Sequence, residues 1–206
     1  MATTVTIYSD YKSPYAYLAV GPAYQLAEDF GLALEWRPYT LDIPAYLGEA
    51  QVDETGAVVH AERNAHQWRR VKYSYMDCRR YAGRQGLTIL GPRKIFDSRV
   101  VNTATLYAQA QDKLRPFHDM AFERFFRREL EAEDPRAVAA LLRETGVDAD
   151  GFVDYQAGPG RAELERLQRE AEGRGVFGVP TFVLDGEIFW GREHLPLIRE
   201  FLAADA

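Results

Sequence analysis

The chain has 206 residues, of which 47% are hydrophobic and 27% are charged; this is the composition of a folded globular protein and excludes a disordered chain. Its 25 Lys and Arg residues against 31 Asp and Glu residues give a net charge of −6 at pH 7, so we expect no nucleic-acid partner. The single cysteine, Cys78, excludes an intramolecular disulfide, a cysteine-based zinc site and a C-x-x-C redox centre.

The sequence carries neither a recognisable secretory signal nor a membrane span. Residues 1–8 lack the basic and long apolar regions of a signal peptide, and no apolar run approaches the roughly 18 residues that a spanning helix requires. We therefore expect a soluble, cytoplasmic protein without a membrane partner.

The first 40 residues predict a β-α-β unit. Residues 4–9 are rich in β-branched side chains and read as a strand. Ser13 and Pro14 then provide an N-cap and a first-turn proline for a helix that ends at Gly31. Residues 32–38 form a second strand, which we expect to run parallel to the first.

The middle of the chain, residues 44–175, is predicted to be helical because β-branched runs are scarce there. The segment from Gly48 to Gly56 is the most loop-like. The expected helices are Gln67 to Arg84, Val101 to Gln111, Phe117 to Leu130, Pro135 to Thr145 and Arg161 to Glu172.

The C-terminal segment predicts a β-β-α unit. Two short apolar runs, 179–184 and 187–190, flank an Asp-Gly pair that is typical of a hairpin turn, and a helix follows Gly191. Together the two ends indicate an α/β thioredoxin-like fold. Residues 1–43 and 176–206 would form the discontinuous thioredoxin-like domain, and residues 44–175 a large all-helical insertion.

Three stretches carry a family resemblance: residues 9–19 (SDYKSPYAYLA), 175–182 (GVFGVPTF) and 189–191 (FWG). They resemble the 2-hydroxychromene-2-carboxylate isomerase and kappa-class glutathione transferase group of the DsbA-like thioredoxin superfamily. The resemblance implies an enzyme that uses glutathione and acts on a small aromatic or conjugated acid. It also suggests a homodimer, although the apolar pattern itself marks no interface.

Ser13 is the predicted catalytic residue. Ser13-Pro14-Tyr15-Ala16 stands where redox members of the superfamily carry C-x-x-C, so exchange through a thiolate pair is excluded. A hydroxyl at a helix N-terminus can hydrogen-bond an incoming thiolate and lower the pKa of the thiol. The resemblance places glutathione against Ser13, Pro14 and Tyr15; the alternative is that Ser13 only caps its helix.

The Val179-Pro180 pair is the second expected contact of glutathione. Proline is out of place in a central strand, and the resemblance implies a cis peptide bond that presents the Val179 backbone to the ligand. The alternative is a trans proline at the start of a strand. Near the last helix, Arg192 and Glu193 stand where the family binds the α-amino group of glutathione; Glu193 could equally be an ordinary first-turn acid.

A helix in the middle of the chain supplies the remaining candidates. The segment from Arg70 to Asp77 resembles the family's Lys-x-x-Tyr-x-x-x-Asp pattern, with Arg70 in the lysine position. The family's glutathione-binding asparagine has Asn64 as its nearest counterpart. We expect Tyr73 and Asp77, four residues apart, to pair with each other on one helix face. The four histidines have no metal-ligand spacing, so no metal is expected.

The leading hypothesis is a glutathione-dependent isomerase, similar to 2-hydroxychromene-2-carboxylate isomerase, that acts by reversible thiolate addition to a conjugated aromatic acid. Two alternatives remain: a glutathione transferase, or a DsbA-like protein without redox activity that binds peptides. Retention on immobilised glutathione separates a glutathione-binding enzyme from a peptide-binding protein.

Overall fold

The computed structural model describes residues 3–204 and opens with the predicted β-α-β unit. Strand β1 (Thr4–Ser9) is followed by helix α1 (Pro14–Phe30) and strand β2 (Ala33–Pro38), which pairs with β1 in parallel. Helix α1 begins at the Ser13 N-cap, with Pro14 in its first turn, and ends at Gly31 in the left-handed conformation (φ 64°), where a glycine is favoured.

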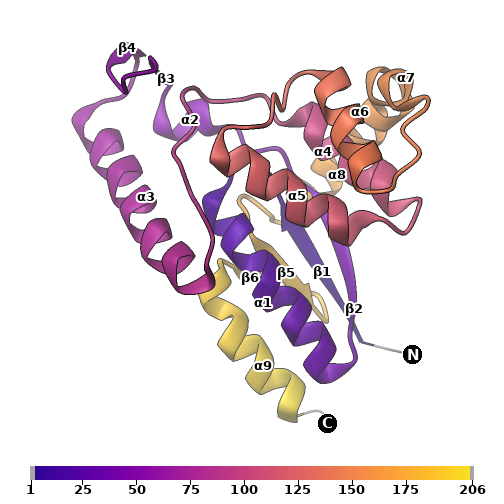
Figure 1. The fold of residues 1–206 in the computed structure, drawn as a ribbon. Coiled ribbons are helices and arrows are strands. Elements are labelled where there is room, and N and C mark those ends of the chain that lie inside the picture. Colours follow the sequence, from indigo (N-terminus) through magenta and orange to yellow (C-terminus); the bar gives the residue numbers. More distant parts are fainter. Residues whose placement is uncertain (1–2, 205–206) are drawn as a thin grey trace.

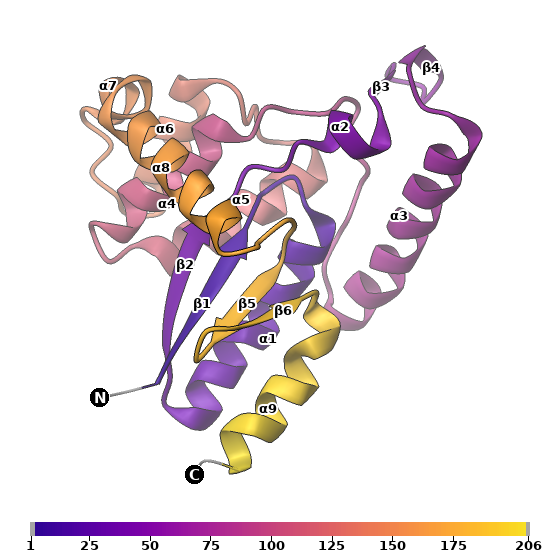
Figure 2. The same cartoon turned by 180° about the vertical axis from the view of Figure 1, so that it is seen from behind.

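The C-terminal segment forms the predicted hairpin and closing helix. Strands β5 (Thr181–Leu184) and β6 (Glu187–Trp190) are antiparallel, and the short 3₁₀ turn η1 (Arg192–His194) leads into helix α9 (Leu195–Ala204). Strand β5 pairs with β1, so the four-stranded sheet has the order β2-β1-β5-β6 and is built from both ends of the chain. Figure 1 shows α1 and α9 side by side on one face of this sheet, and Figure 2 shows the strands from behind.

The segment between β2 and β5 is mainly helical, and all five predicted helices are present within a few residues of the expected bounds. Two further short helices, α2 and α7, were not predicted. Helix α3 packs along α1, while α4 to α8 gather at the end of the sheet where β1 stops (Figure 1). The helices are α2 (Ile43–Leu47), α3 (Ala65–Gln85), α4 (Arg99–Gln109), α5 (Leu114–Arg127), α6 (Pro135–Glu144), α7 (Phe152–Ala157) and α8 (Pro159–Gly173).

The expectation of an all-helical insertion is wrong in one place. Strands β3 (Ala50–Val52) and β4 (Val58–Ala61) form a small antiparallel hairpin within it, and β3 lies in the stretch expected to be a loop. The turn is held by Asp53, whose Oδ1 accepts from the backbone N–H groups of Thr55 at 2.8 Å and Ala57 at 3.0 Å. Strand β3 has only three residues, too few for alternation to mark a strand in a sequence, and β4 is fully exposed and has no alternation at all.

The core between α1 and α5 is aromatic. Tyr17 of α1 lies parallel to Phe122 and to Phe126, with ring centroids 5.3 Å and 5.5 Å apart, and Phe117 is fully buried nearby. This packing fixes α1, and therefore its N-terminus, against the helical part of the chain.

Candidate functional site

The candidate site lies in the turn of residues 10–13, between the end of β1 and the start of α1. The N–H of Ser13 donates to the Asp10 carbonyl at 3.0 Å, which closes the turn. The carboxylate of Asp10 accepts from the N–H of Leu41 at 2.8 Å and thereby ties the turn to the segment after β2. Ser13 is thus held at a helix N-terminus, where free N–H groups and the helix dipole favour negative charge.

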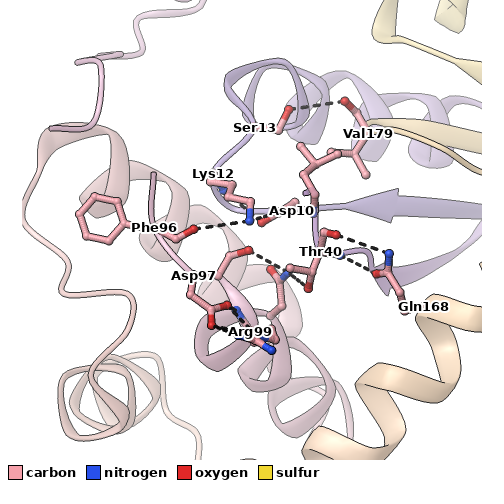
Figure 3. A network of polar contacts seen from close by, with 12 residues as sticks. Asp10, Lys12, Ser13, Thr40, Phe96, Asp97, Arg99, Gln168 and Val179 are labelled. Atoms are coloured by element: carbon pink, nitrogen blue, oxygen red, sulfur yellow. Dashed lines mark hydrogen bonds and ion pairs between the residues drawn. The ribbon is translucent and has the colours of Figure 1, made fainter. Parts of the chain in front are cut away.

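The Ser13 hydroxyl has two partners in this turn. Its oxygen accepts from the N–H of Ala16 at 3.2 Å, and its hydrogen donates to the Val179 carbonyl at 3.5 Å (Figure 3). The second contact is at the outer limit of a hydrogen bond, so a charged acceptor would replace the carbonyl readily. Ser13 therefore does cap its helix, and it also faces the Val179 backbone across the site.

The Val179-Pro180 peptide bond is cis, which confirms the prediction made from the sequence. The surrounding loop is held by two hydrogen bonds: the Thr181 hydroxyl donates to the Gly178 carbonyl at 2.7 Å, and the N–H of Gly191 donates to the Pro180 carbonyl at 2.9 Å. The loop before β5 and the end of β6 therefore form one unit opposite Ser13.

Tyr15 joins the start of α1 to the middle of α3. Its hydroxyl donates to Asp77 at 3.4 Å, and Arg80 lies 3.8 Å from the other carboxylate oxygen. Tyr73 is 57% exposed and has no hydrogen bond to Asp77 among the described residues, so the expected pairing of Tyr73 with Asp77 is wrong. The reason is that α3 packs on α1 around the buried Cys78, and Tyr73 lies one turn beyond this contact.

The contact between α1 and α3 contains no reactive thiolate. Burial raises the pKa of Cys78 to about 12, and the nearby Tyr15 hydroxyl counteracts this only in part. Burial likewise raises the pKa of Tyr15, so at neutral pH both groups stay protonated. Cys78 is therefore an inert buried thiol, and Tyr15 is available as a hydrogen-bond donor.

Arg192 and Glu193 lie in the 3₁₀ turn η1 rather than in the first turn of α9. The guanidinium of Arg192 stacks 3.6 Å above the ring of Tyr81 and so links η1 to α3. The exposed carboxylate of Glu193 folds back over Gly191, where a Cβ atom would come within 2.4 Å of it. Gly191 has a φ of 108°, so both the backbone and the close approach favour glycine.

Asn64 and Arg70 lie on α3 on the N-terminal side of the Tyr15 contact. Asn64 is the N-cap of α3, and its side chain accepts from the N–H groups of His66 at 2.9 Å and Gln67 at 3.0 Å. Thirteen residues separate Asn64 from Asp77, which is roughly 20 Å along the helix axis. The structure therefore gives Asn64 a capping role, and it places Arg70 on the exposed surface of α3.

A cavity of about 600 Å³ opens next to the turn that holds Ser13, between β2, α2, α4 and α8. None of the residues that line this cavity was expected from the sequence, because they come from four separate segments. Lys12, directly before Ser13, is the one whose position in the sequence could have drawn attention. The lining consists of Lys12, Thr40, Leu41, Asp42, Pro44, Glu49, Ile95, Phe96, Asp97, Arg99, Leu164, Glu165, Gln168 and Arg169.

Two other kinds of site were considered for residues 3–204. No group of three or more His, Cys, Asp or Glu side chains in this range is arranged to hold a metal ion. None of the helices described is long and apolar enough to cross a membrane.

The chain has a mixed sheet, a cis Val179-Pro180 bond and, opposite this bond, a helix that starts at Ser13. These features define a thioredoxin-type protein. The family model of the DSBA-like thioredoxin domain matches residues 4–203. The chain belongs to this DSBA-like family, in the group that contains the 2-hydroxychromene-2-carboxylate isomerases.

Three relatives support this placement. The chain is 30% identical to 2-hydroxychromene-2-carboxylate isomerase from Sphingobium xenophagum, over 98% of this chain and 99% of that protein. It is 28% identical to the enzyme of the same name from Pseudomonas putida, over 95% of this chain and 92% of that one. A solved structure of 2-hydroxychromene-2-carboxylate isomerase has the same fold, with a TM-score of 0.77 and 22% identity over 98% of this chain and 95% of that chain.

Proposed function

We propose that the protein is an isomerase that acts on a conjugated aromatic acid and uses glutathione. Its relatives are named 2-hydroxychromene-2-carboxylate isomerase, and glutathione as the thiol is part of the proposal. The observation that carries the proposal is the Ser13 hydroxyl, which lies at the N-terminus of α1 and faces the Val179 carbonyl at 3.5 Å. The proposal includes a cytoplasmic location, where glutathione keeps thiols reduced.

The residues around Ser13 suit a peptide that carries a thiol. The hydroxyl can turn its hydrogen from the Val179 carbonyl, a weak partner at 3.5 Å, to a sulfur atom, while its oxygen keeps the bond from Ala16. The Val179 backbone, released from Ser13, is then free to pair with the backbone of the bound peptide, as an added strand does. Tyr15, Arg192 and Glu193 lie on the two elements that flank this position.

When bound, glutathione supplies a thiolate that adds reversibly to a conjugated double bond, permits rotation about it and leaves unchanged. Ser13 donates a hydrogen bond to the charged sulfur, and the helix N-terminus adds its partial positive charge. Both interactions favour the thiolate over the thiol, so they increase the fraction of nucleophile at neutral pH. Lys12, the residue before Ser13, lines the cavity next to this turn.

The test is the isomerisation of 2-hydroxychromene-2-carboxylate, followed by its ultraviolet absorbance with and without glutathione. We expect turnover that saturates with glutathione and that falls sharply in the Ser13→Ala variant. S-Methylglutathione, which has no free thiol, is the control and should not support the reaction. Turnover at the same rate without glutathione would contradict the proposal.

A further inference from the structure

The cavity beside Ser13 has an apolar wall and a cationic corner. Its volume of about 600 Å³ is in the range of small-molecule sites. Leu41, Ile95 and Phe96 supply apolar surface suited to a planar ring. The charged lining residues are the cations Lys12, Arg99 and Arg169 and the acids Asp42, Glu49, Asp97 and Glu165. Figure 3 shows the Lys12 ammonium beside Asp10 and joined to the Phe96 carbonyl, while the Ser13 hydroxyl faces Val179.

Lys12 is buried but has no short hydrogen bond from its ammonium group among the described residues. Its side chain is 6% exposed, and Nζ lies 3.4 Å from the Phe96 carbonyl and 3.6 Å from Oδ2 of Asp10. Charge-assisted bonds of an ammonium to a carboxylate are typically about 2.7–2.9 Å long. A buried ammonium with two long contacts, at the wall of a cavity, can bind a further acceptor closely.

Backbone hydrogen bonds to Asp10 hold the turn around Lys12. Asp10, with its side chain fully buried, accepts from the Leu41 N–H at 2.8 Å and from the Lys12 N–H at 3.3 Å. The carboxylate is therefore engaged by two backbone groups, and its contact with the Lys12 ammonium is long at 3.6 Å. The same turn holds Ser13, the next residue in the chain, whose N–H donates to the Asp10 carbonyl at 3.0 Å.

Most of the acidic side chains of the cavity have partners of their own. Asp97 is bound by Arg99, with contacts of 2.8 Å and 2.9 Å from Nε, and Glu165 pairs with Arg161 at 3.3 Å. Asp42 caps α2 by accepting from a backbone N–H at 3.2 Å. Glu49, the fourth acid, comes from the segment after α2 and not from the turn that carries Lys12.

We propose that this cavity binds the aromatic acid substrate, and that Lys12, the residue before Ser13, binds its carboxylate. The apolar wall would contact the ring, and the ammonium would replace its contact with Phe96 by a short bond to the carboxylate. This inference rests on the proposed function, because it names the substrate-binding residue of the same site.

The test is equilibrium binding by calorimetry, without glutathione, so that it does not depend on catalysis. The probes are 2-hydroxycinnamate, a conjugated aromatic acid, and its uncharged methyl ester, both at low ionic strength. We expect the unmodified protein to bind the acid at least about tenfold more tightly than the ester, the size of one charge-assisted hydrogen bond. The Lys12→Met variant should lose this preference by binding the acid as weakly as the ester.

Two further variants make the result specific. Lys113→Met removes an exposed lysine outside the cavity and should keep the preference for the acid. Lys12→Met leaves Asp10 buried without its counter-charge; if circular dichroism shows that this variant does not fold, the Asp10→Asn, Lys12→Met double variant removes both charges together.

Equal binding of acid and ester by the unmodified protein would overturn the inference, and so would a preference that survives the loss of Lys12. These outcomes are separate from a failure of the proposed function. Binding of the acid through Lys12 without glutathione-dependent turnover would contradict only the proposed function. Turnover without any Lys12-dependent preference would contradict only the inference.

Discussion

Replacing Ser13 by alanine should separate its two roles, because each affects a different measurement. The oxygen that accepts from Ala16 caps α1, and loss of such a cap destabilises a protein by about 1 kcal/mol. The contact with the Val179 carbonyl, at 3.5 Å, adds little to stability. We therefore expect Ser13→Ala to fold normally and to lose about 1 kcal/mol of unfolding free energy in urea titrations.

The second effect of Ser13→Ala is on bound glutathione. A hydrogen bond to a charged group contributes about 1.5–3 kcal/mol, and 1.36 kcal/mol corresponds to one pKa unit. Losing the bond from Ser13 should therefore raise the pKa of the bound thiol by roughly one to two units, while the helix dipole remains. The thiolate fraction at neutral pH then falls, and the isomerisation rate with it.

Ultraviolet absorbance of the thiolate, titrated against pH in the complex with glutathione, measures this shift directly. Asp134→Ala is a matched control, because Asp134 caps α6 by accepting from Arg136 at 2.9 Å and lies outside the site. It should lower stability by a similar amount and leave the thiol pKa unchanged. Superimposable titration curves for Ser13→Ala and the unmodified protein would show that Ser13 is only a cap and would refute its catalytic role.

Three further outcomes are expected from the core and the loop. Burial lowers the pKa of His118 to about 3, so below pH 6.5 the unfolded chain binds a proton that the folded chain does not. The unfolding free energy should therefore fall by about 1.4 kcal/mol per pH unit as the pH is lowered. His118→Phe should remove this part of the slope between pH 7 and pH 5 in urea titrations. Phe122→Ala should cost about 3–5 kcal/mol in the same assay, because the ring is buried between two tyrosines; a loss below 1 kcal/mol would contradict this packing. Gly178→Ala should lower glutathione affinity measured by calorimetry, since the new Cβ would lie 2.6 Å from Nε1 of Trp190 and displace the loop beside the site; unchanged affinity would contradict this.

The thioredoxin-like ends of the chain could be predicted because their signals are local. Ser13 with Pro14 marks the start of a helix, and the Asp185-Gly186 pair marks a hairpin, whatever the rest of the chain does. The cis Val179-Pro180 bond and the facing positions of Ser13 and Val179 followed from the family resemblance. These are the parts of the site that the structure brings together.

The remaining parts of the site depend on contacts between distant segments, which a sequence pattern does not encode. Asp77 pairs with Tyr15, 62 residues away, instead of with the tyrosine one turn before it. The ammonium of Lys12 meets the carbonyl of Phe96 over a separation of 84 residues. Asn64 is only the nearest counterpart of the family's asparagine. Its side chain caps the start of α3, and this local contact decides its role. Such contacts arise from how α3 and the following loop pack against α1 and β1.

The central claim is that Ser13 and the Val179 backbone hold the thiolate of glutathione. A crystal structure of the protein soaked with glutathione tests it most directly. The account predicts the sulfur within hydrogen-bond distance of Ser13 Oγ, with the peptide backbone of the ligand paired to Val179. Glutathione bound with its sulfur away from Ser13, or no binding at a saturating concentration, would contradict it.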